Sequence, residues 1–179
     1  MKKFLLVSGK FLLAVIIIAV SFLWYAGFFN PVYISEKTSG PFEAVVIETG
    51  TFDDPADERN KLFEILFDED IISNQAIAIT PKPFGESLIR QTGWILTPAQ
   101  AQEAAGIPPP YKIISIPRQD RIVADFDYNN SFNIMAGAFV AYRSMKAYCN
   151  DKGFRTGRMY EVYDDKQSRI FYHLNIEPQ

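Results

Sequence analysis

The architecture of this chain is clearest in the segment Arg121-Ile122-Val123-Ala124-Asp125-Phe126-Asp127-Tyr128. Ile, Ala, Phe and Tyr alternate there with other residues at a period of two, the pattern of a strand with one buried face. The next segment, Ser131 to Lys152, ends before Gly153 and predicts an amphipathic helix. Its apolar stripe is spaced by threes and fours and consists of Phe132, Met135, Phe139, Tyr142, Met145 and Cys149. Strand-like runs at 158–164 and 169–175 then predict a hairpin.

The same order of elements occurs about 80 residues earlier in the chain. Phe42 to Glu48 has the composition of a strand, a helix is expected from Pro55, and two strand-like runs follow. Aligning Ala44-Val45-Val46-Ile47 with Val123-Ala124-Asp125-Phe126 places helix over helix and hairpin over hairpin. We therefore predict an α+β fold, a tandem βαββ repeat with pseudo-twofold symmetry.

The repeat sets the expected organisation of the folded domain, 42–179. Its first half is expected at 42–97 and its second half at 111–176. We expect the two helices to cover one face of a joint sheet and to leave a groove on the other face, where the halves meet. Clefts of this kind commonly bind small molecules.

The N-terminal segment has a different character. After Lys10, the run Phe11 to Phe29 contains no charged residue, and as a helix it reaches about the 30 Å of a bilayer's hydrocarbon core. We predict a transmembrane anchor at 11–29, after a short N-terminus at 1–10 and before a linker at 30–41. A cleaved secretory signal is the alternative, but the run ends in bulky aromatic residues where a cleavage site needs small ones.

The distribution of basic residues predicts the orientation of this anchor. Lysines precede the apolar run, whereas the first basic residue after it is Lys37. The positive-inside rule then places the N-terminus in the cytoplasm and the domain on the extracytoplasmic side, which is the periplasm in a Gram-negative bacterium. The sequence thus predicts a single-pass membrane protein with a signal anchor.

Several classes of function have little support in the sequence. A net charge of -3 and the lack of a Lys/Arg cluster argue against nucleic acid as a partner. His173 is the only histidine and Cys149 the only cysteine, so we expect no metal site and a buried, unreactive thiol. No phosphate-binding loop, G-x-S-x-G or H-E-x-x-H motif occurs, so no cofactor and no catalytic residue are assigned.

Three segments carry a resemblance to the GyrI-like family, a duplicated strand-helix-strand-strand domain that is also the effector-binding part of bacterial multidrug-responsive transcription activators. They are 39–46, 122–128 and 159–164, and the resemblance covers residues 33 to 176. With the run Tyr111 to Pro117, the order of segments also resembles a membrane-anchored, testis-expressed branch of this family that includes an autophagy receptor.

The resemblance implies a site in the last hairpin. In GyrI-like domains that bind hydrophobic cations, a glutamate points into an aromatic-lined groove, and Glu161 matches its position. Strand alternation places Met159, Glu161 and Tyr163 on one face, and the hairpin places Tyr172 opposite Glu161. Trp94 lies in the corresponding hairpin of the first half, so pseudo-symmetry aims it at the same groove.

Each of these residues also has a purely structural interpretation. Glu161 can lie on a solvated face and pair with Arg143 or Arg158. Core packing is the alternative for Trp94, and it is the expectation for Tyr142 and Met135, which lie on the apolar stripe of the second helix.

Three hypotheses for the function follow. The leading one is a membrane-anchored module that binds a small apolar or cationic molecule in the groove, without chemistry. The second is a hydrolase of strained or electrophilic small molecules that uses Glu161 and Tyr163. The third is a protein-binding scaffold that uses the sheet or the acidic residues at 53–58, and a groove plugged by Trp94 and Tyr172 would favour it.

Overall fold

The computed structural model describes residues 2–50, 55–81 and 90–177, and their side chains from residue 11 onward except those of Pro55 and Glu177. The helices are α1 (Lys2–Tyr25), α2 (Pro55–Asp68), α3 (Pro98–Glu103) with a 3-10 turn after it (Ala104–Gly106), and α4 (Ser131–Lys152). The strands are β1 (Tyr33–Ser39), β2 (Phe42–Thr49), β3 (Gln75–Thr80), β4 (Arg90–Leu96), β5 (Lys112–Ile116), β6 (Gln119–Asp127), β7 (Arg155–Asp164) and β8 (Arg169–Glu177).

One antiparallel sheet contains all of these strands, in the order β1-β6-β8-β7-β3-β4-β2-β5. The order is the same from both edges: β2, β4 and β3 of the first half correspond to β6, β8 and β7 of the second, and β3 pairs with β7 at the centre. In each half a helix, α2 or α4, follows the first of these strands. The predicted α+β class and the strand-helix-strand-strand order are therefore confirmed.

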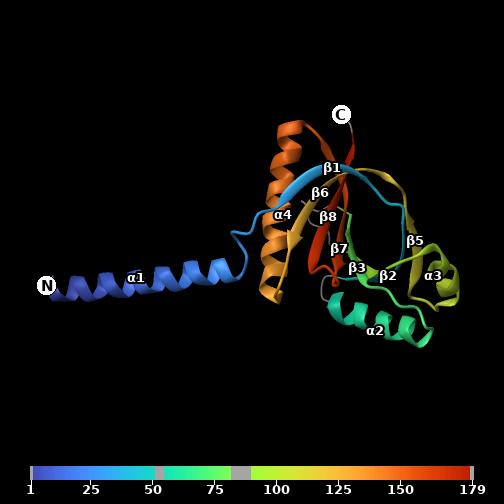
Figure 1. Cartoon of the computed structure of the whole chain (residues 1–179), viewed down its shortest axis with the longest axis horizontal. Helices are drawn as coiled ribbons and strands as arrows, with labels where there is room; N and C mark the ends of the chain where they lie inside the picture. Colours follow the sequence, from blue (N-terminus) through green and yellow to red (C-terminus); the bar gives the residue numbers. More distant parts are fainter. Residues whose placement is uncertain (1, 51–54, 82–89, 178–179) are drawn as a thin grey trace.

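The edge strands force the sheet to curl. β1 lies at one edge and β2 lies next to the other edge, yet only Gly40 and Pro41 separate them in the chain. β5 and β6 are related in the same way through Pro117 and Arg118. Figure 1 shows β1 arching over the top of the sheet to reach the start of β2. Residues 30–41, predicted to be a linker, therefore include an edge strand, because β1 pairs along its whole length with β6.

Two apolar cores lie on the helix-bearing face of the sheet. Leu62 and Leu66 of α2 pack on Val45 and Trp94, whereas Met145 and Cys149 of α4 pack on the second half. The opposite face is lined by Ala44, Val46, Ile77, Ile79, Ile116, Tyr160 and Val162, which are all buried without a covering helix. The curl of the sheet buries these residues.

The N-terminal half of helix α4 contacts the sheet through smaller residues than the sequence predicts. Ala136, Gly137 and Ala141 are buried, whereas Phe132 and Met135 of the predicted apolar stripe are exposed. A methyl group at Gly137 would lie 2.6 Å from Phe126 Cδ1, so the helix approaches β6 too closely for a side chain there. Cys149 is buried as predicted.

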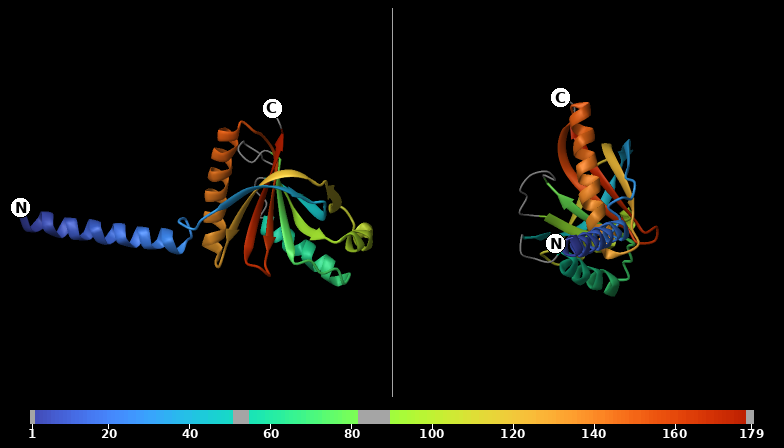
Figure 2. Two further views of the ribbon diagram at one scale, coloured as in Figure 1. Left: turned by 45° about the horizontal axis from the view of Figure 1, so that its top comes forward. Right: turned by 90° about the vertical axis from the view of Figure 1, so that its left-hand side faces the viewer.

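Helix α1 extends away from the sheet, and only its C-terminal end contacts the domain (Figures 1 and 2). Phe22 lies edge-on to Phe132 of α4 at 5.6 Å, and Asn133 Nδ2 donates a hydrogen bond to Tyr25 O at 3.4 Å. Gly27, with φ of +82°, turns the chain toward the sheet beside Asn133.

No helix in the described part of the chain combines the length and apolar character needed to cross a membrane. The prediction of a transmembrane anchor at 11–29, with a cytoplasmic N-terminus and an extracytoplasmic domain, is therefore wrong. Within that apolar run the helix ends at Tyr25, and the chain then turns at 26–29. The part from Phe11 to Tyr25 rises only about 22 Å at 1.5 Å per residue.

Candidate functional site

A large groove lies on the helix-bearing face, between the first turns of α2 and α4. Its volume is about 920 Å³. The strands β3, β4 and β7 form its floor. Its lining residues are Ala56, Arg59, Ala76, Ala78, Arg90, Gln91, Thr92, Trp94, Tyr128, Ser131, Ile134, Met135, Glu161, Tyr163 and Asp165. The groove therefore lies at the junction of the two halves, as predicted, but on the face that carries the helices.

Strand register builds this floor from rows of paired residues. One row crosses the sheet as Thr92, Ala78, Glu161 and Tyr172, and the neighbouring row begins with Trp94, Ala76 and Tyr163. In both rows β3 contributes an alanine. Larger residues at these two positions would fill the centre of the floor. The alanines instead leave open space between the aromatic ring of Trp94 and the carboxylate of Glu161.

Glu161 is the buried acid of the groove. Its exposed fraction is 7%. Tyr163 donates a hydrogen bond to Glu161 Oε2 at 2.6 Å, and Tyr142 of α4 donates a short hydrogen bond to Oε1. Both carboxylate oxygens thus have a phenolic donor, and no described Arg or Lys forms a salt bridge with this side chain. The solvated arrangement with Arg143 or Arg158 is not present.

The surrounding tyrosines act as donors because they stay protonated. Burial, and then the charge of Glu161, raises the pKa of Tyr142, Tyr163 and Tyr172 far above the ordinary value of 10. Tyr172 faces Glu161 across the hairpin, as predicted, and lies edge-on to Tyr142 with a centroid distance of 5.9 Å. Its buried hydroxyl has no hydrogen-bond partner among the described residues.

The opposite side of the groove holds a cation on aromatic rings. The guanidinium carbon of Arg59 lies 6.0 Å from the centroid of Trp94 and 5.7 Å from that of Tyr163. Trp94 Nε1 donates a hydrogen bond to Arg59 O at 3.2 Å, which ties the indole to the first turns of α2. Phe63 packs against the indole from the same helix, with ring centroids 5.2 Å apart.

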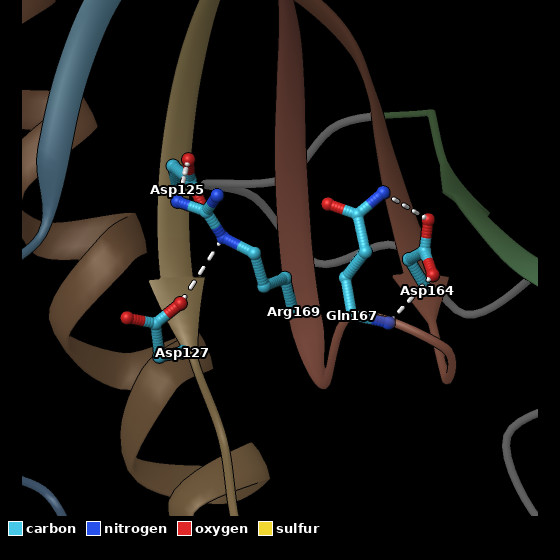
Figure 3. A network of polar contacts seen from close by, with 5 residues as sticks. All are labelled: Asp125, Asp127, Asp164, Gln167 and Arg169. Carbon is cyan, nitrogen blue, oxygen red and sulfur yellow. Dashed lines mark hydrogen bonds and ion pairs between the residues drawn. The ribbon is translucent and has the colours of Figure 1, made fainter.

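A polar network next to the groove fixes the hairpin that carries Glu161 (Figure 3). Arg169 at the start of β8 forms ion pairs with Asp125 and Asp127 of β6, the second at 3.0 Å. In the turn, Gln167 donates two hydrogen bonds to Asp164, from its backbone N at 3.0 Å and its side chain at 3.1 Å. The turn contacts hold the β7–β8 register on which the facing positions of Glu161 and Tyr172 depend, and the ion pairs tie β8 to β6.

The structure separates the five predicted ligand-binding residues into two groups. Glu161, Tyr163 and Trp94 line the groove. Tyr172 and Met159 do not line it, because both are completely buried in the core between the second half of the sheet and α4.

Sequence reasoning missed four residues of this site. Tyr142 was expected in the core, and Met135 was too, but Tyr142 bonds Glu161 and Met135 is an exposed lining residue. Arg59 and Arg90 also line the groove. No local signal distinguishes these arginines from ordinary surface residues, because the docking of α2 and the register of β4 place them.

The groove combines a buried acid, a guanidinium and aromatic rings. Within the described residues, no group of three or more His, Cys, Asp or Glu side chains could hold a metal ion. His173 lies on the opposite face beside Phe42 and Ser39, and burial lowers its pKa to about 4, so its ring is neutral at physiological pH.

No protein-family model and no curated protein matches this sequence. Solved structures do match its fold. SAV2435 bound to tetraphenylphosphonium superposes with a TM-score of 0.51 at 8% identity, covering 81% of this chain and 94% of SAV2435. The C-terminal domain of EcmrR gives a TM-score of 0.50 at 11% identity, covering 83% of this chain and 98% of the domain.

EcmrR in a complex with DNA gives a TM-score of 0.53 at 11% identity, covering 96% of this chain and 68% of that one. SAV2435 and the EcmrR domain have GyrI-like folds. The chain described here therefore has a fold of the GyrI-like class. At these identities the likeness shows the fold alone.

Proposed function

We propose that the chain binds a small apolar or cationic molecule in the groove between α2 and α4. The observation that carries this proposal is the state of Glu161, a carboxylate with an exposed fraction of 7% and no ion pair to a described residue. Two tyrosine hydroxyls solvate its charge but do not neutralise it. A buried charge without a counter-ion is costly, so a ligand cation at this position would be stabilised strongly.

The walls of the groove suit the apolar part of such a molecule. Trp94 and Tyr163 contribute aromatic rings to the lining, and Ile134 and Met135 of α4 add aliphatic surface. A volume of about 920 Å³ falls within the range of sites for drug-sized ligands. SAV2435, with the same class of fold, binds the lipophilic cation tetraphenylphosphonium.

Calorimetric titration with tetraphenylphosphonium tests the proposal. We expect binding by the unmodified chain and at least a tenfold weaker affinity for Glu161→Gln, since the amide keeps the shape of the carboxylate but not its charge. Glu64→Gln on the exposed side of α2 is the matched control and should bind as the unmodified chain does. Equal affinities of the Glu161→Gln and unmodified proteins would contradict the proposal.

The hydrolase alternative is favoured by one contact, the 2.6 Å hydrogen bond between Tyr163 and Glu161. It predicts turnover of an electrophilic substrate that is lost in both Glu161→Gln and Tyr163→Phe. We rank it second, because both oxygens of Glu161 already accept hydrogen bonds and a proton-transfer role would require one to be released.

The scaffold alternative predicted a groove plugged by Trp94 and Tyr172. Trp94 lines the groove and Tyr172 lies in the core, so neither closes it. Of the acidic residues at 53–58, Asp53 and Asp54 lie outside the described residues. The resemblance to the testis-expressed branch of the family stays a prediction and contributes nothing to the proposed ligand.

A further inference from the structure

Arg59 introduces a positive charge into the groove that a purely cationic ligand does not explain. It lines the groove over the faces of Trp94 and Tyr163, where a ligand cation would otherwise stack. The aromatic surface nearest to Glu161 is therefore already occupied by a guanidinium of the protein itself. A monocation in the groove would be attracted by Glu161 and repelled by Arg59.

The guanidinium of Arg59 also has unused hydrogen-bonding capacity. Its Nε is buried and has no hydrogen-bond partner among the described residues. No described carboxylate forms an ion pair with Arg59 or with Arg90, the second arginine of the lining. A planar guanidinium binds carboxylate, sulfonate or phosphate groups through paired N–H donors, so an anionic group in the groove would satisfy this side chain.

We propose that the ligand is zwitterionic, with a cationic group beside Glu161, an apolar body on the groove floor and an anionic group bound by Arg59. This inference rests on the proposed function and specifies its ligand class. The register sets the separation of the two charges. Arg59 lies over Tyr163, which is two residues from Glu161 on β7, and residues on the same face of a strand are about 7 Å apart.

The geometry also explains why the two charged groups do not cancel each other within the protein. Glu161 is held down at the floor by Tyr142 and Tyr163, whereas Arg59 is held on the rings of Trp94 and Tyr163. Tyr163 takes part in both arrangements, as donor to the acid and as a ring under the guanidinium. The two charges therefore stay apart. A ligand with a cationic group for Glu161 and an anionic group for Arg59 can bridge them.

Two probes that differ only in an anionic group test this inference with the full-length chain. Butyltriphenylphosphonium carries the cation alone, and (4-carboxybutyl)triphenylphosphonium adds a carboxylate at a comparable separation. At near-neutral pH we expect the carboxylated probe to bind about five- to tenfold more tightly, because Arg59 supplies a charge-assisted hydrogen bond that is partly screened by solvent.

Variants of Arg59 assign the effect. Arg59→Gln should abolish the preference for the carboxylated probe and leave butyltriphenylphosphonium bound at least as tightly as before, because a repulsive charge is removed. Arg59→Lys should keep part of the preference. Arg118→Gln, an exposed arginine outside the groove lining, should change neither affinity. Thermal unfolding of each variant verifies that it folds.

The outcomes separate this inference from the proposal on which it rests. If both probes bind with equal affinity to the unmodified chain and to Arg59→Gln, the zwitterion inference is wrong and the cation site stands. A preference for the carboxylated probe that survives in Arg59→Gln also overturns the role of Arg59. If neither probe binds, both the inference and the proposed function fall.

Discussion

Tyr163 lies two residues after Glu161 on β7, and its hydroxyl donates a 2.6 Å hydrogen bond to the Glu161 carboxylate. Because alternate residues of a strand share a face, the pair is preorganised by the strand itself and needs no loop or helix to bring it together. The acid of the groove is thereby held in one orientation before any ligand arrives.

Removing this donor should destabilise the protein. Tyr163→Phe leaves Glu161 Oε2 buried without a partner, so we expect the free energy of unfolding to fall by about 1–3 kcal/mol. Urea denaturation measures the change. Tyr148→Phe is the control: that hydroxyl bonds the exposed Glu36 at 2.7 Å, so its loss should cost less than about 1 kcal/mol. Equal losses of unfolding free energy in the two variants would show that the buried hydrogen bond stabilises the protein no more than the exposed one.

The close contact of α4 with β6 predicts that a single methyl group is harmful. Alanine normally favours a helix interior over glycine by about 1 kcal/mol. At Gly137, however, the new Cβ would lie 2.6 Å from Phe126 Cδ1, and overpacking of this kind costs about 1–3 kcal/mol. We expect Gly137→Ala to lower the melting temperature. Gly106→Ala, whose Cβ would meet nothing within 4 Å, should leave it unchanged. A stabilised Gly137→Ala protein would contradict the packing described.

The buried side chain of Arg121 leads us to expect that stability depends strongly on the planar shape of its guanidinium. Its exposed fraction is 0%, and its guanidinium donates hydrogen bonds to Ser39, Pro117 and Asn175, where the β1–β2 and β5–β6 connections meet. Lysine keeps the charge but not the planar fork, so Arg121→Lys should lose about 2–4 kcal/mol of unfolding free energy. The exposed Arg118→Lys should change it by less than about 0.5 kcal/mol. Similar denaturation midpoints for the two variants would refute this assignment.

His173 predicts a pH dependence of stability. Burial, followed by the charges of Arg121 and Lys37, lowers its pKa from 6.5 to about 4. Between these values the unfolded chain binds a proton that the folded chain excludes. The contribution of the neutral imidazole to the free energy of unfolding is thus complete above about pH 6.5. It is lost as the pH falls toward 4, and the loss is roughly 3 kcal/mol.

His173→Gln isolates this contribution from the titration of acidic residues. Urea unfolding at several pH values between 7 and 4.5 should give a steeper loss of stability for the unmodified chain than for the variant. Parallel pH profiles would mean that the imidazole does not titrate differently in the folded and unfolded states.

The order of elements could be predicted from local patterns, because the periods of two and of three to four residues reflect which side of a strand or helix is buried. The helix expected at Ser131 to Lys152 has those bounds in α4. The strands at 155–164 and 169–177 also fall within a few residues of the expected 158–164 and 169–175. The strand at 33–39 was missed, since its side chains are largely exposed and show no alternation of burial.

The helix faces were harder to predict than the helices. Of the apolar stripe predicted for α4, Met145 and Cys149 are buried, whereas Phe132, Met135 and Phe139 are exposed. Phe139 instead lies 5.9 Å from Phe28 and Phe132 lies beside α1. Hydrophobicity identifies the larger side chains, but α4 approaches β6 so closely at Gly137 that only a small residue fits there. That distance is a property of the assembled sheet.

Residues close together in the chain could thus be assigned from sequence: the two similar halves, the hairpin at 165–168, and the facing pair Glu161 and Tyr172. The groove itself depends on residues far apart. Pairing of β3 with β7 brings the halves together, and the docking of α2 sets Arg59 over Tyr163. Backbone geometry fixes the relationships between residues that are close in the chain. The relationships between distant residues require the packing of the whole sheet, which no short segment of the chain determines.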